Sequence, residues 1–186
     1  MNFNMNILKW ILKAILWIGL VILGMIALLL ITGLFMKKEF SLQEEVLINR
    51  PKQEVYDYVK YLQNQNNYST WATMDPTMKQ EFRGTDGTVG FVSAWDGEQI
   101  GKGEQEIVKI TEGERIDYEL RFIEPWPGVN QVYMITEGVS ENQTRVRWGI
   151  QGPMPYPMNV TTPIMTKMFR KDFRTGLDNL KAVLER

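Results

Sequence analysis

The chain has 186 residues, which corresponds to about one domain of ordinary size and a smaller segment. It contains no cysteine and no histidine, which excludes thiol nucleophiles, disulfides, histidine-dependent catalysis and the usual zinc ligands. Segment 1–38 has four lysines and no acidic residue. Because the whole chain has 21 basic and 22 acidic residues, residues 39–186 carry a net charge of −5. We therefore expect no nucleic-acid partner, since a domain with this net charge does not neutralise phosphates. Because the usual zinc ligands are missing, we also expect no metal, and we expect no cofactor.

An apolar run lies near the N-terminus. The residues from Ala14 to Met36 include no charged side chain, and at about 1.5 Å per residue they span about 34 Å, enough to cross the hydrocarbon core of a bilayer. Lysines flank the run on both sides, and Trp10 and Trp17 lie near one end, where indoles favour the membrane interface. We predict a single transmembrane helix within segment 1–38. A cleaved signal peptide is the alternative, although the run is long and ends in Met-Lys-Lys.

The orientation of this helix follows from weaker signals. Two lysines precede the apolar run and two follow it, so the count of basic residues is tied. The tail before the run has no acidic residue, whereas Glu39, Glu44 and Glu45 follow it. We expect the tail inside the cytoplasm and the C-terminal domain outside.

Residues 39–186 have the pattern of one α+β domain. A first strand is expected over 41–49, a helix beginning at Arg50-Pro51, and a polar loop or short helix over 64–69. Six further extended segments follow at 78–83, 88–95, 101–111, 115–123, 131–140 and 144–151. Asp86-Gly87 and Asp96-Gly97 are typical of type I′ hairpin turns, in which both central residues have positive φ. Successive hairpins predict an antiparallel meander.

The periodicity of apolar residues indicates which faces are covered. Ile116, Tyr118, Leu120 and Phe122 alternate with charged residues, which predicts a sheet with one covered and one solvated face. Apolar residues at three- and four-residue steps predict a long amphipathic C-terminal helix that covers it, with Pro163 at its start. Its stripe consists of Met165, Phe169, Phe173, Leu177, Leu180 and Leu184.

The order of these elements resembles the Bet v 1-like, or START-like, helix-grip fold of the SRPBCC superfamily. Leu47-Ile48-Asn49-Arg50-Pro51 followed by Glu54-Val55-Tyr56 is similar to the family's opening. Asp86-Gly87-x-x-Gly90 with Trp95, and Gly101-x-Gly103 leading into Ile107, resemble its central strands. Thr144-x-Val146-x-Trp148 and Phe173-x-x-Gly176-Leu177 resemble its last strand and terminal helix.

The resemblance covers 41–186 and is strongest to bacterial polyketide cyclase/dehydrase-like members. It implies about seven antiparallel strands curved around the last helix, with a hydrophobic cavity between them for a lipid, a sterol or an aromatic metabolite. It also implies a bacterial cell membrane as the location. The family includes enzymes, carriers and receptors, so the fold alone does not specify the function.

Candidate ligand-contacting residues are aromatic and apolar side chains in the segments expected to line that cavity. Trp126, between two prolines, is the preferred rim residue, and the methionines near the start of the last helix suit an adaptable apolar wall. The candidates are Trp71, Phe91, Trp95, Tyr118, Leu120, Phe122, Trp126, Tyr133, Trp148, Met154, Met165 and Phe169. Packing in an ordinary core is the alternative for each of them.

An enzyme would need a carboxylate among apolar groups, because burial raises its pKa into a useful range. Glu104, Glu106 and Glu137 lie in expected strands, but which of them face inward depends on register, and exposure on the outer face is the alternative.

Three hypotheses follow. The first is a membrane-anchored domain that binds a hydrophobic small molecule or lipid. The second is a cyclase or dehydratase that uses one of these carboxylates, and the third is a protein-interaction scaffold with a filled core.

Overall fold

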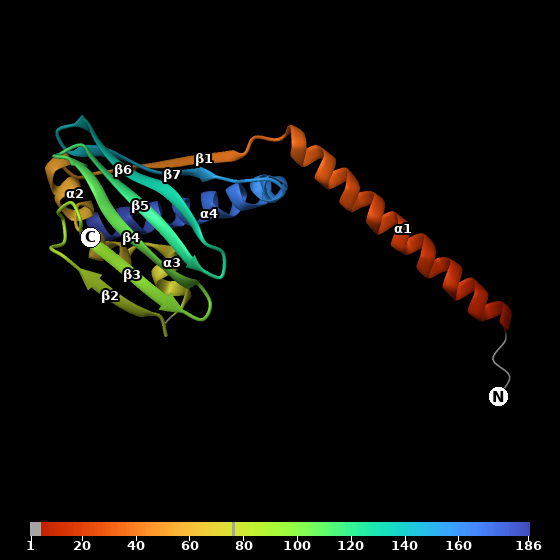
Figure 1. Cartoon of the computed structure of the whole chain (residues 1–186). Helices are drawn as coiled ribbons and strands as arrows, with labels where there is room; N and C mark the ends of the chain where they lie inside the picture. Colours follow the sequence, from red (N-terminus) through yellow and green to blue (C-terminus); the bar gives the residue numbers. More distant parts are fainter. Residues whose placement is uncertain (1–4, 76) are drawn as a thin grey trace. The chain divides into compact units, whose positions relative to one another are not determined.

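The computed structural model describes residues 5–75 and 77–186 (Figure 1). The chain divides into two compact units, one formed by the residues up to Lys38 with Met154–Thr162, and the other by Glu39–Pro153 with Pro163–Arg186. The helices are α1 (Met5–Phe35), α2 (Lys52–Val59), η1 (Leu62–Asn67), α3 (Thr70–Met74), η2 (Met158–Thr161) and α4 (Thr162–Leu184). The strands are β1 (Glu39–Ile48), β2 (Lys79–Arg83), β3 (Val92–Gly97), β4 (Gly101–Thr111), β5 (Arg115–Glu124), β6 (Gly128–Ser140) and β7 (Gln143–Pro153).

The N-terminal apolar run is helical, as expected. Among the described residues, one helix is long and apolar enough to cross a membrane, and it covers Lys9–Phe35 of α1. The helix begins earlier than the apolar run, so that Lys9 and Lys13 lie within it, and it ends before Lys37.

All seven strands form one antiparallel sheet in the order β1-β7-β6-β5-β4-β3-β2. The predicted meander is confirmed from β2 to β7, and β1 completes the sheet by pairing with β7 along its whole length. The alternation in β5 is also confirmed, since Ile116, Tyr118 and Leu120 are buried while the charged residues between them are partly exposed.

The C-terminal helix α4 lies against the concave face of the sheet (Figure 1). Phe173, Leu177 and Leu180 of its apolar stripe are almost fully buried. Arg50, from the Arg-Pro step after β1, donates from Nε to the backbone oxygen of Leu184 at 2.6 Å. Because the last carbonyls of a helix have no partner within it, this contact caps the end of α4. The fold is therefore the predicted helix-grip arrangement.

Both predicted type I′ turns are wrong. Of the first pair only Gly87 has positive φ, and Asp96-Gly97 lies inside β3 rather than in the turn that follows. Asp86 accepts hydrogen bonds from the backbone amides of Leu62 and Gln63 at 2.8 and 3.0 Å. Its carboxylate thus binds the start of η1, a tertiary contact that overrides the local turn preference, and β3 begins at Val92 instead of residue 88.

Candidate functional site

A cavity of about 470 Å³ lies in the second unit, between the sheet, the N-terminal half of α4 and the η1–α3 segment. The closing helix and the curved sheet therefore do not fill the space between them. A volume of this size lies within the range of about 300 to 1,000 Å³ that is usual for small-molecule sites.

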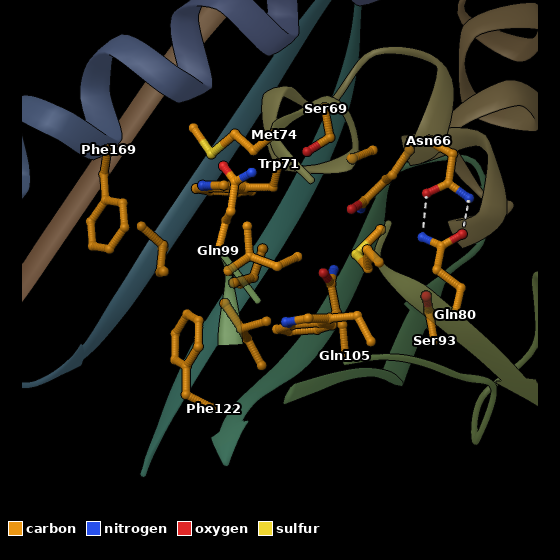
Figure 2. A pocket seen from close by; sticks show the side chains of 18 of the residues that line it. Asn66, Ser69, Trp71, Met74, Gln80, Ser93, Gln99, Gln105, Phe122 and Phe169 are labelled. Atoms are coloured by element: carbon orange, nitrogen blue, oxygen red, sulfur yellow. Dashed lines mark hydrogen bonds between the residues drawn. The ribbon is translucent and has the colours of Figure 1, made fainter. Parts of the chain in front are cut away.

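Aromatic rings form much of the cavity wall. Trp148 of β7 stacks on Phe173 of α4 with ring centroids 4.6 Å apart, and Trp71 of α3 meets Phe173 edge to face at 5.5 Å. Phe169 and Phe122 project toward the same space from α4 and β5 (Figure 2). These rings are held by one another and by the sheet, which gives the wall a defined apolar shape.

The polar groups of the cavity are almost all uncharged. They are Gln65, Asn66, Ser69, Gln80, Ser93, Gln99 and Gln105. Asn66 and Gln80 pair through both of their amides at 3.0 and 2.9 Å (Figure 2), so they satisfy each other and leave little capacity for a ligand.

Gln105 is different. Its side chain points from β4 into the cavity (Figure 2), and its Nε2 is buried with no hydrogen-bond partner among the described residues. The buried indole Nε1 of Trp148 also has none within that part of the chain. Because an unpaired buried donor is costly, these groups favour an occupant that carries a hydrogen-bond acceptor.

Glu124 is the one charged side chain among the described lining residues. It lies at the end of β5, is exposed, and is followed by the equally exposed Pro125 and Trp126. Trp126 is 80 % exposed although it lines the cavity, which places it at the mouth.

A buried carboxylate holds the turn between β3 and β4 at the edge of the cavity. Asp75 is 2 % exposed and accepts hydrogen bonds from the backbone amides of Gln99 and Thr77, both at 3.0 Å. The Gln99 amide, followed by the Thr77 hydroxyl, lowers the pKa of Asp75. Since Gln99 lines the cavity, Asp75 positions part of its wall, a role with no local signal in the sequence.

Eight of the sequence-derived candidates line the cavity. They are Trp71, Trp95, Leu120, Phe122, Trp126, Trp148, Met165 and Phe169. Several further lining residues were missed, including Phe173, which the helical periodicity had assigned to the stripe of α4. The sequence could also have predicted Gln105, because an uncharged amide between two glutamates in an alternating strand indicates a side chain on the inner face of the sheet.

Four candidates lie away from this cavity. Phe91 stacks on Phe82 with ring centroids 6.1 Å apart, and Tyr118 is buried, which raises the pKa of its hydroxyl. Tyr133 belongs to the opposite face of the sheet, where its hydroxyl donates to Gln43 at 2.9 Å. Met154 belongs to the other unit of the chain.

The three candidate carboxylates also lie away from the cavity, in ion pairs on the outer face of the sheet. Glu104 is bound by Arg83 and, at 2.7 Å, by Nε of Arg121, which also binds Glu106 at 2.6 Å. Glu137 pairs with Arg147 at 2.8 Å. Alternation explains this placement, because Gln105 turns inward and its two neighbours must turn outward.

Residues 5–75 and 77–186 contain no group of histidine, cysteine or carboxylate side chains that could hold a metal ion.

Solved structures of other proteins share this fold. The Zhui aromatase/cyclase from Streptomyces sp. R1128 superposes with a TM-score of 0.61 at 9 % identity, covering 80 % of this chain and 94 % of that one. Norcoclaurine synthase from Thalictrum flavum gives 0.59 at 10 % identity, covering 78 % and 93 %. The Aha1 dimer from Colwellia psychrerythraea gives 0.55 at 17 % identity, covering 78 % and 96 %. At these identities the likeness concerns the fold alone.

No curated protein matches the sequence significantly. The family described as "Polyketide cyclase / dehydrase and lipid transport" matches residues 39–185, which is most of the chain and includes every residue of the cavity. The chain therefore belongs to the polyketide cyclase/dehydrase and lipid-transport family of SRPBCC domains, with an apolar helix in front of the helix-grip fold.

Proposed function

We propose that this chain is a membrane-anchored domain, spanning 39–186, that binds an uncharged hydrophobic small molecule or lipid in its cavity. The observation that carries the proposal is the cavity itself, about 470 Å³ of space walled by aromatic rings and uncharged amides. A charged ligand would lose its hydration there without gaining an ion pair, except at Glu124 near the mouth. The unpaired donor of Gln105 supports a ligand with at least one acceptor oxygen.

The anchor is the second part of the proposal. The α1 residues after Lys13 are apolar and exposed over several turns, so in water they would leave a large apolar surface uncovered. A bilayer covers such a surface, and segment 1–38 is then the tail and single span. A binding cavity tethered to a membrane has a short path to lipid-soluble ligands. We place the tail in the cytoplasm and the domain outside a bacterial cell membrane, which protease protection in oriented vesicles tests.

The test of binding uses the full chain in detergent micelles and the neutral fluorescent probe N-phenyl-1-naphthylamine. Ala72 lines the cavity, whereas Ala94 lies on β3 between the inward Ser93 and Trp95 and so faces outward. Ala72→Trp should occupy part of the cavity and weaken probe binding about tenfold or more, since the lost contacts are worth more than 1.4 kcal/mol. Ala94→Trp is the matched control and should bind normally. Equal binding by the two variants, or no binding by the parent chain, would contradict the proposal.

An enzyme is the alternative function, and one observation supports it. Glu124 is a carboxylate at the mouth of an apolar cavity, in a family whose description includes cyclases and dehydrases. In such an enzyme Glu124 is the group placed to exchange a proton with a bound substrate. The test compares Glu124→Gln with the unsubstituted chain. Loss of turnover in this variant, with probe binding unchanged, would favour an enzyme over a carrier.

A further inference from the structure

The segment between β7 and α4 packs against the C-terminal end of α1, within the first unit of the chain. Asn159 is fully buried, and its Nδ2 donates to the backbone oxygens of Gly33 at 2.6 Å and Met36 at 3.3 Å. The backbone amide of Met154 donates to the backbone oxygen of Lys38 at 2.8 Å. Three contacts thus hold Met154–Thr162 to the last turn of α1 and the residues after it.

Gly33 makes this contact possible. A Cβ atom at residue 33 would lie 2.8 Å from Cγ1 of Val160 and 3.3 Å from the ring of Tyr156. At the other glycines of the same helix, Gly19 and Gly24, a Cβ would meet nothing within 4 Å. The absent side chain of Gly33 therefore marks a specific docking point, and the other two glycines are matched controls.

The docking point lies at the depth where an apolar span ends. The uncharged run extends to Met36, so Gly33 is three residues, or about 4.5 Å, from its end. The carbonyl of Gly33 belongs to the last turn of α1, where helix carbonyls have no partner within the helix. In hydrocarbon such an unpaired group is costly, and the Asn159 amide removes that cost.

The segment itself suits a membrane interface. From Trp148 to Thr166 the chain carries no charged residue. Tyr156 and Met158 are 40 % and 52 % exposed although both are largely apolar. Tyrosine is enriched where a bilayer meets water, since its ring favours the acyl boundary and its hydroxyl favours the headgroups.

We infer that Met154–Thr162 is a lipid-contacting segment that closes the outer end of the membrane span, with the side chains of Tyr156 and Met158 in the headgroup and upper acyl region of the bilayer. The occupant of this exposed apolar surface is the same bilayer that holds α1. The inference rests on the anchor in the proposed function and is independent of what the cavity binds.

The absence of native cysteine allows a direct test. Met158→Cys and Val139→Cys are introduced singly into the full chain in phosphatidylcholine vesicles, and the rate of labelling with a membrane-impermeant maleimide is measured. Val139 is 46 % exposed on β6, so the protein alone shields the two positions to a similar degree. We expect residue 158 to react about tenfold more slowly than residue 139, because lipid covers it. Equal rates would overturn the inference.

A second measurement does not depend on reaction rates. A nitrobenzoxadiazole fluorophore on residue 158 should be quenched by lipids that carry a nitroxide near the headgroup, and the same fluorophore on residue 139 should not. Failure of quenching at residue 158 counts against lipid contact even where labelling is slow.

Two glycine variants test the docking. Gly33→Leu in the Met158→Cys background should displace the segment from α1 and bring its labelling rate toward that of residue 139. Gly24→Leu, of equal size in an open position, should leave the rate unchanged. Identical rates for the two variants would show that α1 does not hold the segment.

Extraction with alkaline carbonate separates loss of the membrane anchor from loss of lipid contact at residue 158. If alkaline carbonate removes the chain from vesicles, the chain has no membrane span, and both the anchor and the lipid-contacting segment are wrong. A chain that stays embedded while residue 158 labels as fast as residue 139 keeps its anchor and loses only the interfacial segment.

Discussion

Replacing Glu104 by glutamine tests whether this carboxylate stabilises the sheet or serves the cavity. Its side chain is 19 % exposed and is bound by Arg121, 26 % exposed, and by Arg83, 49 % exposed. A hydrogen bond to a charged group contributes about 1.5 to 3 kcal/mol, whereas an exposed ion pair contributes about 0 to 1 kcal/mol. Glutamine keeps one acceptor oxygen and loses the charge, so we expect the free energy of unfolding to fall by about 1.5 to 2 kcal/mol.

The control is Glu137→Gln, which removes a carboxylate that is 47 % exposed and also faces two arginines. Water and salt screen that cluster more strongly, so the expected loss is about 0.5 kcal/mol or less. Both variants are unfolded with urea in detergent micelles and followed by tryptophan fluorescence, since the helix-grip domain holds four of the six tryptophans. Neither variant should change the affinity for N-phenyl-1-naphthylamine.

The pH dependence gives an independent check on the same residue. Partial burial raises the pKa of Glu104, but the hydrogen bonds from Arg121 and Arg83 outweigh it, and the pKa is lowered overall. The carboxylate therefore adds stability above its unfolded pKa of about 4.3, and this contribution is lost as the pH falls through the lower folded value. The gap between the parent chain and Glu104→Gln should close under acid conditions. Equal stability of Glu104→Gln and Glu137→Gln at neutral pH, or a gap that persists in acid, would refute this reasoning.

Three further outcomes are expected. Leu177→Ala, at a fully buried position in α4, should lower the free energy of unfolding by about 3 to 5 kcal/mol in the same urea assay. Acidification through the lowered pKa of Asp75 should protonate it and release the turn that it holds, so that the protection factor of the Gln99 amide against hydrogen exchange falls, and Asp75→Asn should lower the same protection factor at neutral pH. Gly103→Ala should displace the indole of Trp95 in the cavity wall and weaken probe binding, because the new methyl group meets that ring and also the backbone oxygen of Arg121 on β5.

Each of these has a result that would count against it. A loss below about 1 kcal/mol for Leu177→Ala would mean that α4 does not pack as described. An unchanged protection factor of the Gln99 amide, both in acid and in Asp75→Asn, would mean that Asp75 does not support the turn. For Gly103→Ala the control is Gly128→Ala, where a methyl group meets nothing within 4 Å, and equal probe binding by the two would mean that the wall tolerates the shift.

Local spacing in the sequence was enough to predict the elements and the two faces of the sheet. Residues two apart on a strand share a face, so the pattern of Ile116, Tyr118 and Leu120 predicted their burial without any knowledge of the partner strands. The stripe of α4 and the apolar helix α1 follow from spacing and composition in the same way. The turn at Asp86 failed because its carboxylate binds amides more than twenty residues earlier in the chain.

Only the tertiary structure decided which residues meet at the cavity and which meet at the end of α1. Alternation puts Gln105 and Glu104 on opposite faces of β4, but only register and curvature decide which rings surround Gln105 and which arginines bind Glu104. Likewise Asn159 reaches the carbonyl of Gly33 across 126 positions of sequence. No pattern within a short window encodes such a contact, because it depends on where the folded strands and helices bring distant segments together.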